Sequence, residues 1–388
     1  MNQTLSLNGD WKLLHSDGER GRAEYALAET IQPERYLAAQ VPGSVHLDLM
    51  RAGLIDDPAL GLNSLKARWV EECIWAYRRE FDFTAPAAPT AVWLVLECLD
   101  LNAKIYLNGQ QVGQHNNAFV PCRLEVSRFL RTGKNWITVI IESGIIGAGD
   151  KLSTGVGSKD AYHFGQNLHK QHWLRKPAYQ FGWDWTARLG NVGISGDVTL
   201  EWSEETALRL DTLVPLVQVH EDLQTATVTV RARVENSGST LQKVQLQAAI
   251  PELDWTADTA FEVEPGCHIL EVVRDITGFA LWWPTGAGEA ILYSLAAHVL
   301  VDEVRLDYAP KRIGFRHVRV NQDPHPDGGN YCIVEVNHRR IFLKGANSIP
   351  ADMILARVED SRYRALIDRA VEANFNFLRV WGGGVYES

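Results

Sequence analysis

The spacing of apolar residues changes along this 388-residue chain, and that change limits the folds open to it. Between residues 226 and 250, apolar and polar residues alternate, which is typical of strands with one buried face. From Glu359 the spacing becomes helical. It places Tyr363, Leu366, Ile367, Ala370 and Val371 on one stripe. The sequence therefore predicts a mainly β, multidomain protein in which a long β region precedes a shorter α/β region.

The first two hundred residues are predicted to be β structure. Ala103–Leu107 leads into Asn108-Gly109, the strongest short signal for a hairpin. Trp136–Ile141 is a further apolar run that is rich in β-branched residues. Short strands and turns at this spacing predict a jelly-roll β-sandwich over residues 1–203, with one short helix between Val45 and Leu54.

A second unit is predicted over residues 204–312. Ala226–Val234 and Val244–Ile250 alternate in character on either side of a turn that begins at Glu235. Two half-buried strands around a turn, in a segment of this length, predict an immunoglobulin-like β-sandwich. We expect this unit to act as a spacer without chemistry of its own.

The last segment, residues 313–388, is predicted to hold a strand–helix–strand unit. Arg340–Lys344 is interpreted as a compact buried strand, the helix runs from Glu359 to Asn374, and Phe375–Val380 is the second strand. A parallel pair of strands needs cover on both faces. The sequence is therefore expected to stop inside a domain at Ser388.

Composition excludes several classes of partner. The formal net charge is −10 at pH 7, which argues against nucleic acid and anionic membranes. The five cysteines form no close pair, so free thiols in a reducing compartment are expected. The start has no apolar core of a secretory signal, and no stretch is long and apolar enough to span a membrane. A cytoplasmic location is expected.

Phe181-Gly182-Trp183-Asp184-Trp185 is the segment with the clearest chemical content. Indoles offer flat apolar area with few rotors, and a carboxylate is a strong hydrogen-bond acceptor. A sugar ring matches both, because its C–H face stacks on an aromatic ring while its hydroxyls donate to the acid. The alternative is that both indoles are core residues and Asp184 caps a turn.

Several histidines precede this segment. His163, His169 and His172 match no common ligand spacing, and no cysteine lies close to them. We therefore expect no metal and no cofactor. The run is dense in polar and aromatic residues, which favours a long functional loop over a strand.

A family resemblance is carried by motifs along nearly the whole chain. In order, they are Leu7-Asn8-Gly9-Asp10-Trp11, Val41-Pro42-Gly43-Ser44-Val45-His46, Tyr77-Arg78-Arg79-Glu80-Phe81, Tyr106-Leu107-Asn108-Gly109, Phe181-Gly182-Trp183-Asp184-Trp185, Leu281-Trp282-Trp283-Pro284, Gly314-Phe315-Arg316, Leu343-Lys344-Gly345-Ala346-Asn347 and Arg379-Val380-Trp381-Gly382-Gly383-Gly384. Together they resemble glycoside hydrolase family 2. The pentad and the Trp-Gly-Gly-Gly run resemble its β-mannosidase branch.

The resemblance implies a retaining exo-β-mannosidase, with residues 313–388 forming the start of a catalytic (β/α)8 barrel. Such enzymes release terminal non-reducing β-D-mannose with two glutamates whose carboxyls lie roughly 5 Å apart. In this family both glutamates lie on later barrel strands, so no catalytic residue is expected within this chain, and the 388 residues alone are expected to be inactive. The substrate would be a β-mannoside glycoside or oligosaccharide. Two alternatives are a non-catalytic carbohydrate-binding protein and another exo-glycosidase of the family.

The resemblance also implies a set of substrate-binding residues: Trp183, Asp184, Arg175, Trp381 and Asn347. Asp184 would accept hydrogen bonds from mannose hydroxyls. Arg175 would neutralise that carboxylate or contact the sugar, and Trp381 and Asn347 would line the pocket. Two residues depart from the family pattern: Thr186 stands where a glycine is expected, and Ser348 where a tryptophan is common.

Overall fold

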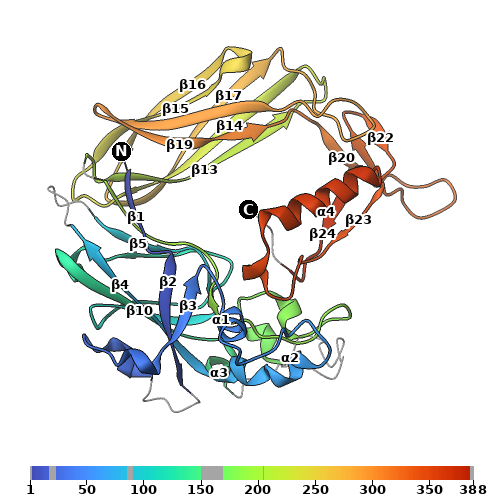
Figure 1. The fold of residues 1–388 in the computed structure, drawn as a ribbon. Helices are drawn as coiled ribbons and strands as arrows, with labels where there is room; N and C mark the ends of the chain where they lie inside the picture. The colour runs from blue at the N-terminus through green and yellow to red at the C-terminus, as the bar shows by residue number, and fades with distance from the viewer. Residues whose placement is uncertain (1, 17–22, 85–90, 150–168, 204, 385–388) are drawn as a thin grey trace. The chain divides into compact units, whose positions relative to one another are not determined.

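The computed structural model describes residues 2–16, 23–84, 91–149, 169–203 and 205–384, drawn as a ribbon in Figure 1. The chain divides into two compact units. The jelly-roll unit holds the described parts of residues 3–202, 348–364 and 380–388. The immunoglobulin-like unit holds the described parts of residues 1–2, 203–347 and 365–379. Each unit is considered by itself below.

Two antiparallel sheets and a short β-ladder make up the jelly-roll unit. The six-stranded sheet has the order β3-β2-β4-β10-β7-β8, with bounds Leu37–Val41, Gly9–Ser16, Ile74–Phe83, Gly133–Glu142, Asn102–Leu107 and Gln110–His115. The four-stranded sheet has the order β1-β12-β5-β9, with bounds Asn2–Ser6, Val198–Ser203, Trp93–Leu96 and Cys122–Glu125. β6 (Leu99–Asp100) pairs with β11 (Gly193–Ile194). Both sheets contribute to one core, which includes Trp75, Tyr77, Leu94, Ile137 and Leu200.

Local predictions in this unit are confirmed. Asn108 and Gly109 join β7 to β8 with φ angles of 52° and 79°, as a tight hairpin turn requires. Helix α1 (Val45–Arg51) lies within the predicted segment, and the Ser44 hydroxyl caps it by accepting a bond of 3.4 Å from Leu47 N. Two further short helices are α2 (Asn63–Lys66) and α3 (Ile145–Ala148).

The immunoglobulin-like unit is a sandwich of a three-stranded and a four-stranded sheet. The first has the order β13-β14-β17, with bounds Leu208–Val219, Thr225–Asn236 and Gly266–Thr277. The second has the order β16-β15-β18-β19, with bounds Trp255–Val263, Gln242–Ile250, Tyr293–Val301 and Val304–Ile313. The turn after Asn236 carries the chain from one sheet to the other, so β14 and β15 do not pair. Apolar and polar residues alternate along β14 and β15, so that each strand buries one face. The buried side chains include Val228, Val230, Leu246 and Ala248.

The buried strand predicted for Arg340–Lys344 is wrong. β22 (Arg339–Ile341) ends early and pairs antiparallel with β21 (Ile333–Val336), which also pairs with β20 (Val318–Asn321). The Phe342 side chain is 83% exposed. Residues 342–344 connect β22 to β23, so the apolar side chains in this segment are not evidence of a buried strand.

The predicted strand–helix–strand order is present further on. β23 (Gly345–Ser348) and β24 (Phe377–Val380) flank α4 (Asp360–Glu372), and Asn374, at φ 55°, lies just past the helix end. Bonds from Asn376 N to Lys344 O and from Trp381 N to Ser348 O, each 2.9 Å, show that the strands run parallel. The apolar stripe of α4 is exposed, with Leu366 at 39%, Ile367 at 51% and Val371 at 63%.

None of the helices in the described ranges is long and apolar enough to cross a membrane.

A buried histidine makes the stability of the jelly-roll unit depend on pH. His46 is fully buried, and neither ring nitrogen has a hydrogen-bond partner among the described residues. Burial, with a contribution from the Lys176 charge, lowers the pKa of His46 to about 3. Because the folded pKa lies below the unfolded one, His46 contributes stability above about pH 6.5 that is lost as the pH falls toward 3.

We expect His46→Gln to remove this loss, because glutamine does not titrate. Between about pH 6.5 and 4, the free energy of unfolding of the wild type should fall relative to the variant by up to about 1.4 kcal/mol per pH unit. Asp48, whose pKa burial raises to about 6, has the opposite slope and is common to both proteins. Urea denaturation at several pH values measures the difference, and parallel curves for the two proteins would contradict the assignment.

Candidate functional site

The pentad forms a turn in the jelly-roll unit, with Phe181 buried and Asp184 exposed. A short 3-10 helix, η6 (Ala178–Phe181), ends at Gly182, whose φ of 95° and ψ of 145° are open only to glycine. Trp183 N then donates to Thr186 O over 3.0 Å and closes the turn. Asp184 is exposed at the tip, while Trp183 and Trp185 are half-buried on either side.

Four rings gather at this turn and are called the indole cluster below: Tyr179, Trp183, Trp185 and Trp381. The Trp183 and Trp381 rings lie 5.0 Å apart at an interplanar angle of 66°. Trp185 lies 6.1 Å from Trp381 and 5.5 Å from Tyr179. These are the edge-to-face and tilted arrangements that aromatic quadrupoles favour. The structure therefore brings together Trp183 and Trp381, which the sequence analysis selected from distant motifs.

Asp184 and Arg175 do not neutralise each other in the structure. In the described part of the chain, the Asp184 carboxylate has no hydrogen bond or ion pair. Arg175 is exposed, and its backbone pairs with Asn117 and accepts a 2.9 Å bond from Ala118 N. The direct role of Arg175 toward a sugar, the other role considered, stays a prediction.

Asn347 belongs to the immunoglobulin-like unit. It lies in β23, where its side-chain oxygen accepts a 3.2 Å bond from Arg379. Its role in a sugar site stays a prediction.

The residues that depart from the family pattern fit the local backbone. Thr186 has no left-handed φ, so the backbone here does not require the expected glycine. Ser348 serves through its backbone oxygen, which accepts from Trp381 N. The neighbouring Asp352 accepts bonds from Ile354 N and Arg357, which is a turn role.

Of the three histidines considered as metal ligands, His163 lies outside the described residues. His169 and His172 lie in the 3-10 helix His169–Trp173.

A buried ionic network holds the segment that precedes the turn. The Lys176 side chain is fully buried, and its ammonium lies 2.6 Å from Asp100 and donates to the carbonyls of Ser143 and Asn191. Gln180 donates to the other Asp100 oxygen over 2.8 Å and also accepts from Asn191 N over 3.0 Å. The sequence analysis missed this network, because a Lys beside an Arg is indistinguishable from a pair of surface cations.

A second buried ion pair holds the chain just after the pentad. Glu71 is buried, pairs with Arg188 and accepts a 2.8 Å bond from Gly190 N. The Glu71 backbone oxygen accepts from the Ser143 hydroxyl over 2.6 Å. Two charge-based anchors therefore fix the segments before and after the turn, which is how a loop site is held in one conformation.

The segment after β23 packs on the same unit. Arg357 forms ion pairs with Asp57 at 3.0 Å and with Asp352 at 2.8 Å. The Met353 carbonyl accepts from Asn191 Nδ2 over 2.9 Å and from the Tyr179 hydroxyl over 3.5 Å. These contacts tie residues 352–357 to the chain around the pentad turn within this unit.

Gly383 sets the position of the Trp381 indole. A Cβ at Gly383 would lie 2.3 Å from atoms of that ring, whereas a Cβ at Gly382 would meet nothing within 4 Å. We expect Gly383→Ala to displace the indole and to change near-ultraviolet circular dichroism and tryptophan emission. Gly382→Ala is the matched control and should leave both spectra as in the wild type. Identical spectra for the two variants would contradict the packing described.

Comparisons with known proteins agree with this architecture. The glycosyl hydrolase 2 galactose-binding domain-like family matches residues 11–196, and the family described as glycosyl hydrolases family 2 matches residues 209–316. Beta-mannosidase B of Emericella nidulans is 31% identical over 368 residues, which cover 92% of this chain and 41% of that protein. Beta-mannosidase B of Aspergillus terreus is 32% identical over 353 residues, covering 90% of this chain and 40% of that protein.

Solved structures give the same result. A beta-D-mannosidase from Dictyoglomus thermophilum matches with a TM-score of 0.83 and 31% identity, covering 100% of this chain and 45% of that one. An exo-chitosanase from Amycolatopsis orientalis matches with a TM-score of 0.72 at 17% identity, which shows a shared fold. The chain spans about two fifths of the length of the curated relatives it matches. Two matched domains in the family's order, and relatives along nearly the whole chain, show that it belongs to glycosyl hydrolase family 2.

Proposed function

We propose that this chain supplies the sugar-recognition wall of a retaining exo-β-mannosidase that releases terminal non-reducing β-D-mannose. The observation that carries the proposal is the indole cluster together with an exposed carboxylate, Asp184, which stands between Trp183 and Trp185 in the sequence and has no partner among the described residues. Relatives named beta-mannosidase, at about 31% identity, support the choice of sugar.

The proposed chemistry at the wall follows from the groups present. A mannose ring lies with its C–H face on an indole of the cluster, while its hydroxyls donate to Asp184 in charge-assisted bonds. Arg175 contacts the sugar, and Trp381 and Asn347 line the pocket. Support from two buried ion pairs leaves little conformational entropy to lose on binding.

The bond-breaking carboxylates are proposed to lie outside these 388 residues. Retention needs a glutamate acid/base and a glutamate nucleophile roughly 5 Å apart at the carboxyl ends of barrel strands. α4 and β24 have exposed apolar side chains, as expected for the first unit of a (β/α)8 barrel that needs cover on both faces. The proposed domains are residues 1–203, 204–312 and 313–388.

The compartment proposed for the protein is the cytoplasm. All five cysteines are free, namely Cys73, Cys98, Cys122, Cys267 and Cys332. Free thiols, two of them exposed, are usual in a reducing environment.

A panel of aryl glycosides tests the proposal. A protein that joins these residues to the remaining length of a family 2 β-mannosidase should hydrolyse p-nitrophenyl β-D-mannoside in preference to the galactoside, glucuronide and glucosaminide. Residues 1–388 alone should show no turnover. Preference for another glycoside would replace the mannosidase assignment, and turnover by residues 1–388 would contradict the placement of the catalytic pair.

A further inference from the structure

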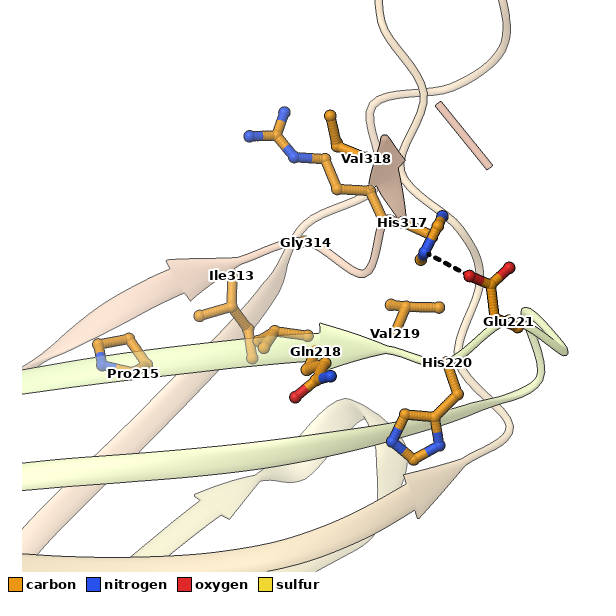
Figure 2. A pocket seen from close by; sticks show the side chains of 11 residues that line it. Pro215, Gln218, Val219, His220, Glu221, Ile313, Gly314, His317 and Val318 are labelled. Atoms are coloured by element: carbon orange, nitrogen blue, oxygen red, sulfur yellow. Dashed lines mark ion pairs between the residues drawn. The ribbon is translucent and has the colours of Figure 1, made fainter. Parts of the chain in front are cut away.

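Three potential metal ligands meet at one end of the immunoglobulin-like unit. Glu221 follows β13, His317 precedes β20, and His338 lies in the turn between β21 and β22. One ligand atom from each residue can be chosen so that all three lie within 4.8 Å of one another. Glu221 and His317 also line an open surface groove of about 790 Å³ with Val219, His220, Arg316 and Val318 (Figure 2).

Each histidine lies about one edge of a tetrahedral zinc site from the Glu221 carboxylate, one at each carboxylate oxygen. His317 Nε2 lies 3.4 Å from Glu221 Oε1, and His338 Nε2 lies 3.5 Å from Glu221 Oε2. Two ligands at the usual 2.0–2.1 Å from Zn²⁺ lie about 3.3–3.4 Å apart when the geometry is tetrahedral. Figure 2 shows the His317 ring directed at the Glu221 carboxylate. The three side chains therefore need little movement to share one ion.

The backbone at His338 gives an independent reason to look for a role. Asn337 and His338 form the two-residue turn between β21 and β22 with φ angles of 50° and 63°. The second position of such a turn is normally glycine, because a side chain is strained there. A histidine therefore carries a backbone cost at this position, and its ring lies 5.1 Å from the His317 ring.

The backbone around His317 is also fixed. Asn337 accepts a 2.8 Å bond from His317 N through its side chain and donates a 2.8 Å bond to His317 O from its backbone. The Nδ1 atom of His317 is buried and has no hydrogen-bond partner among the described residues.

His338 Nε2 lies 2.8 Å from Glu221 O, so without metal this nitrogen donates to the carbonyl. Binding zinc through Nε2 would require the other neutral tautomer of His338, in which the ring proton lies on Nδ1.

We propose that Glu221, His317 and His338 bind a divalent zinc ion, with water from the groove as the fourth ligand. Two imidazoles and one carboxylate are a known zinc ligand set, and imidazole selects zinc over magnesium and calcium. The ion ties the β21–β22 hairpin to the end of β13. The sequence analysis expected no metal from the spacing of His163, His169 and His172. It did not consider Glu221, His317 and His338, which are far apart in the chain and match no short motif.

Titration of tag-free residues 1–388 with ZnCl₂, followed by calorimetry and equilibrium dialysis, tests the site. The background carries Cys267→Ser and Cys332→Ser, since both thiols are exposed and would themselves capture zinc. We expect one Zn²⁺ per chain and a Tm that rises with added zinc. His317→Gln and His338→Gly should each weaken binding by at least about 10-fold.

His338→Gly also separates a ligand from a turn residue. Glycine accepts φ 63°, so the metal-free variant should be at least as stable as the parent while its zinc response is lost. His325→Gln removes a histidine beside an acidic neighbour, Asp327, and should leave zinc binding unchanged. Absence of stoichiometric binding, or binding that both ligand variants leave intact, would overturn the proposal. Neither outcome depends on glycosidase activity.

Discussion

Lys176→Met is expected to lower the free energy of unfolding of the jelly-roll unit by about 3–5 kcal/mol, because it leaves a buried carboxylate without its counter-charge. Lys176 is fully buried, and the Asp100 side chain is only 10% exposed. Methionine keeps the apolar stem but removes the ammonium that lies 2.6 Å from Asp100 and bonds two backbone carbonyls. Urea denaturation followed by tryptophan fluorescence measures the loss.

The double variant Lys176→Met/Asp100→Asn should recover a large part of this stability. Asparagine keeps the shape of Asp100 and can still accept from Gln180, while the uncompensated charge is gone. Asp56→Ala is the control in the same unit, since Asp56 is 74% exposed and lies 4.0 Å from Lys66. It should cost less than about 1 kcal/mol. A Lys176→Met loss as small as that of the control would show that the buried pair does not anchor the turn.

Asp184→Ala is expected to lower kcat/KM toward an aryl β-mannoside by about 10- to 150-fold in a protein that contains the whole catalytic barrel. In the proposed site this carboxylate accepts bonds from sugar hydroxyls, and alanine would remove them. Asp184 makes no bond within the described protein, so the fold should not depend on it. The free energy of unfolding should therefore stay within about 0.5 kcal/mol of the wild type.

The control for Asp184 is another exposed carboxylate of the same unit. Asp197 accepts a 2.8 Å bond from Asn8 and is also exposed. Asp197→Ala should leave kcat/KM unchanged. Equal rates for Asp184→Ala and Asp197→Ala would remove Asp184 from the substrate site.

Local pattern predicted much of the fold. The alternation of apolar and polar residues predicted β14 and β15. The Asn108-Gly109 pair predicted the β7–β8 hairpin, and the apolar stripe at helical spacing predicted α4. These signals depend on neighbours in sequence. The assignment of β14 and β15 to opposite sheets depends on long-range pairing, which the alternation does not contain. The error at Arg340–Lys344 has a similar origin, because an apolar run looks alike whether buried or, as at Phe342, exposed.

The candidate site was predictable where residue type alone carries chemistry. Trp183, Asp184 and Trp381 were selected for the groups they present, and the structure brings the two indoles together. Arg175 was assigned a charge partner that the described residues do not show. Lys176 was missed, since lysine is almost always exposed unless paired, and its partner is remote in sequence.

The most direct test of the sugar-recognition wall pairs Asp184→Ala with monodeoxy p-nitrophenyl β-D-mannosides. If Asp184 accepts from a mannose hydroxyl, removing that hydroxyl should reduce kcat/KM in the wild type but have little further effect in Asp184→Ala, so the two losses are not additive. The account predicts this coupling for at least one deoxy position. Additive losses at every position would contradict it.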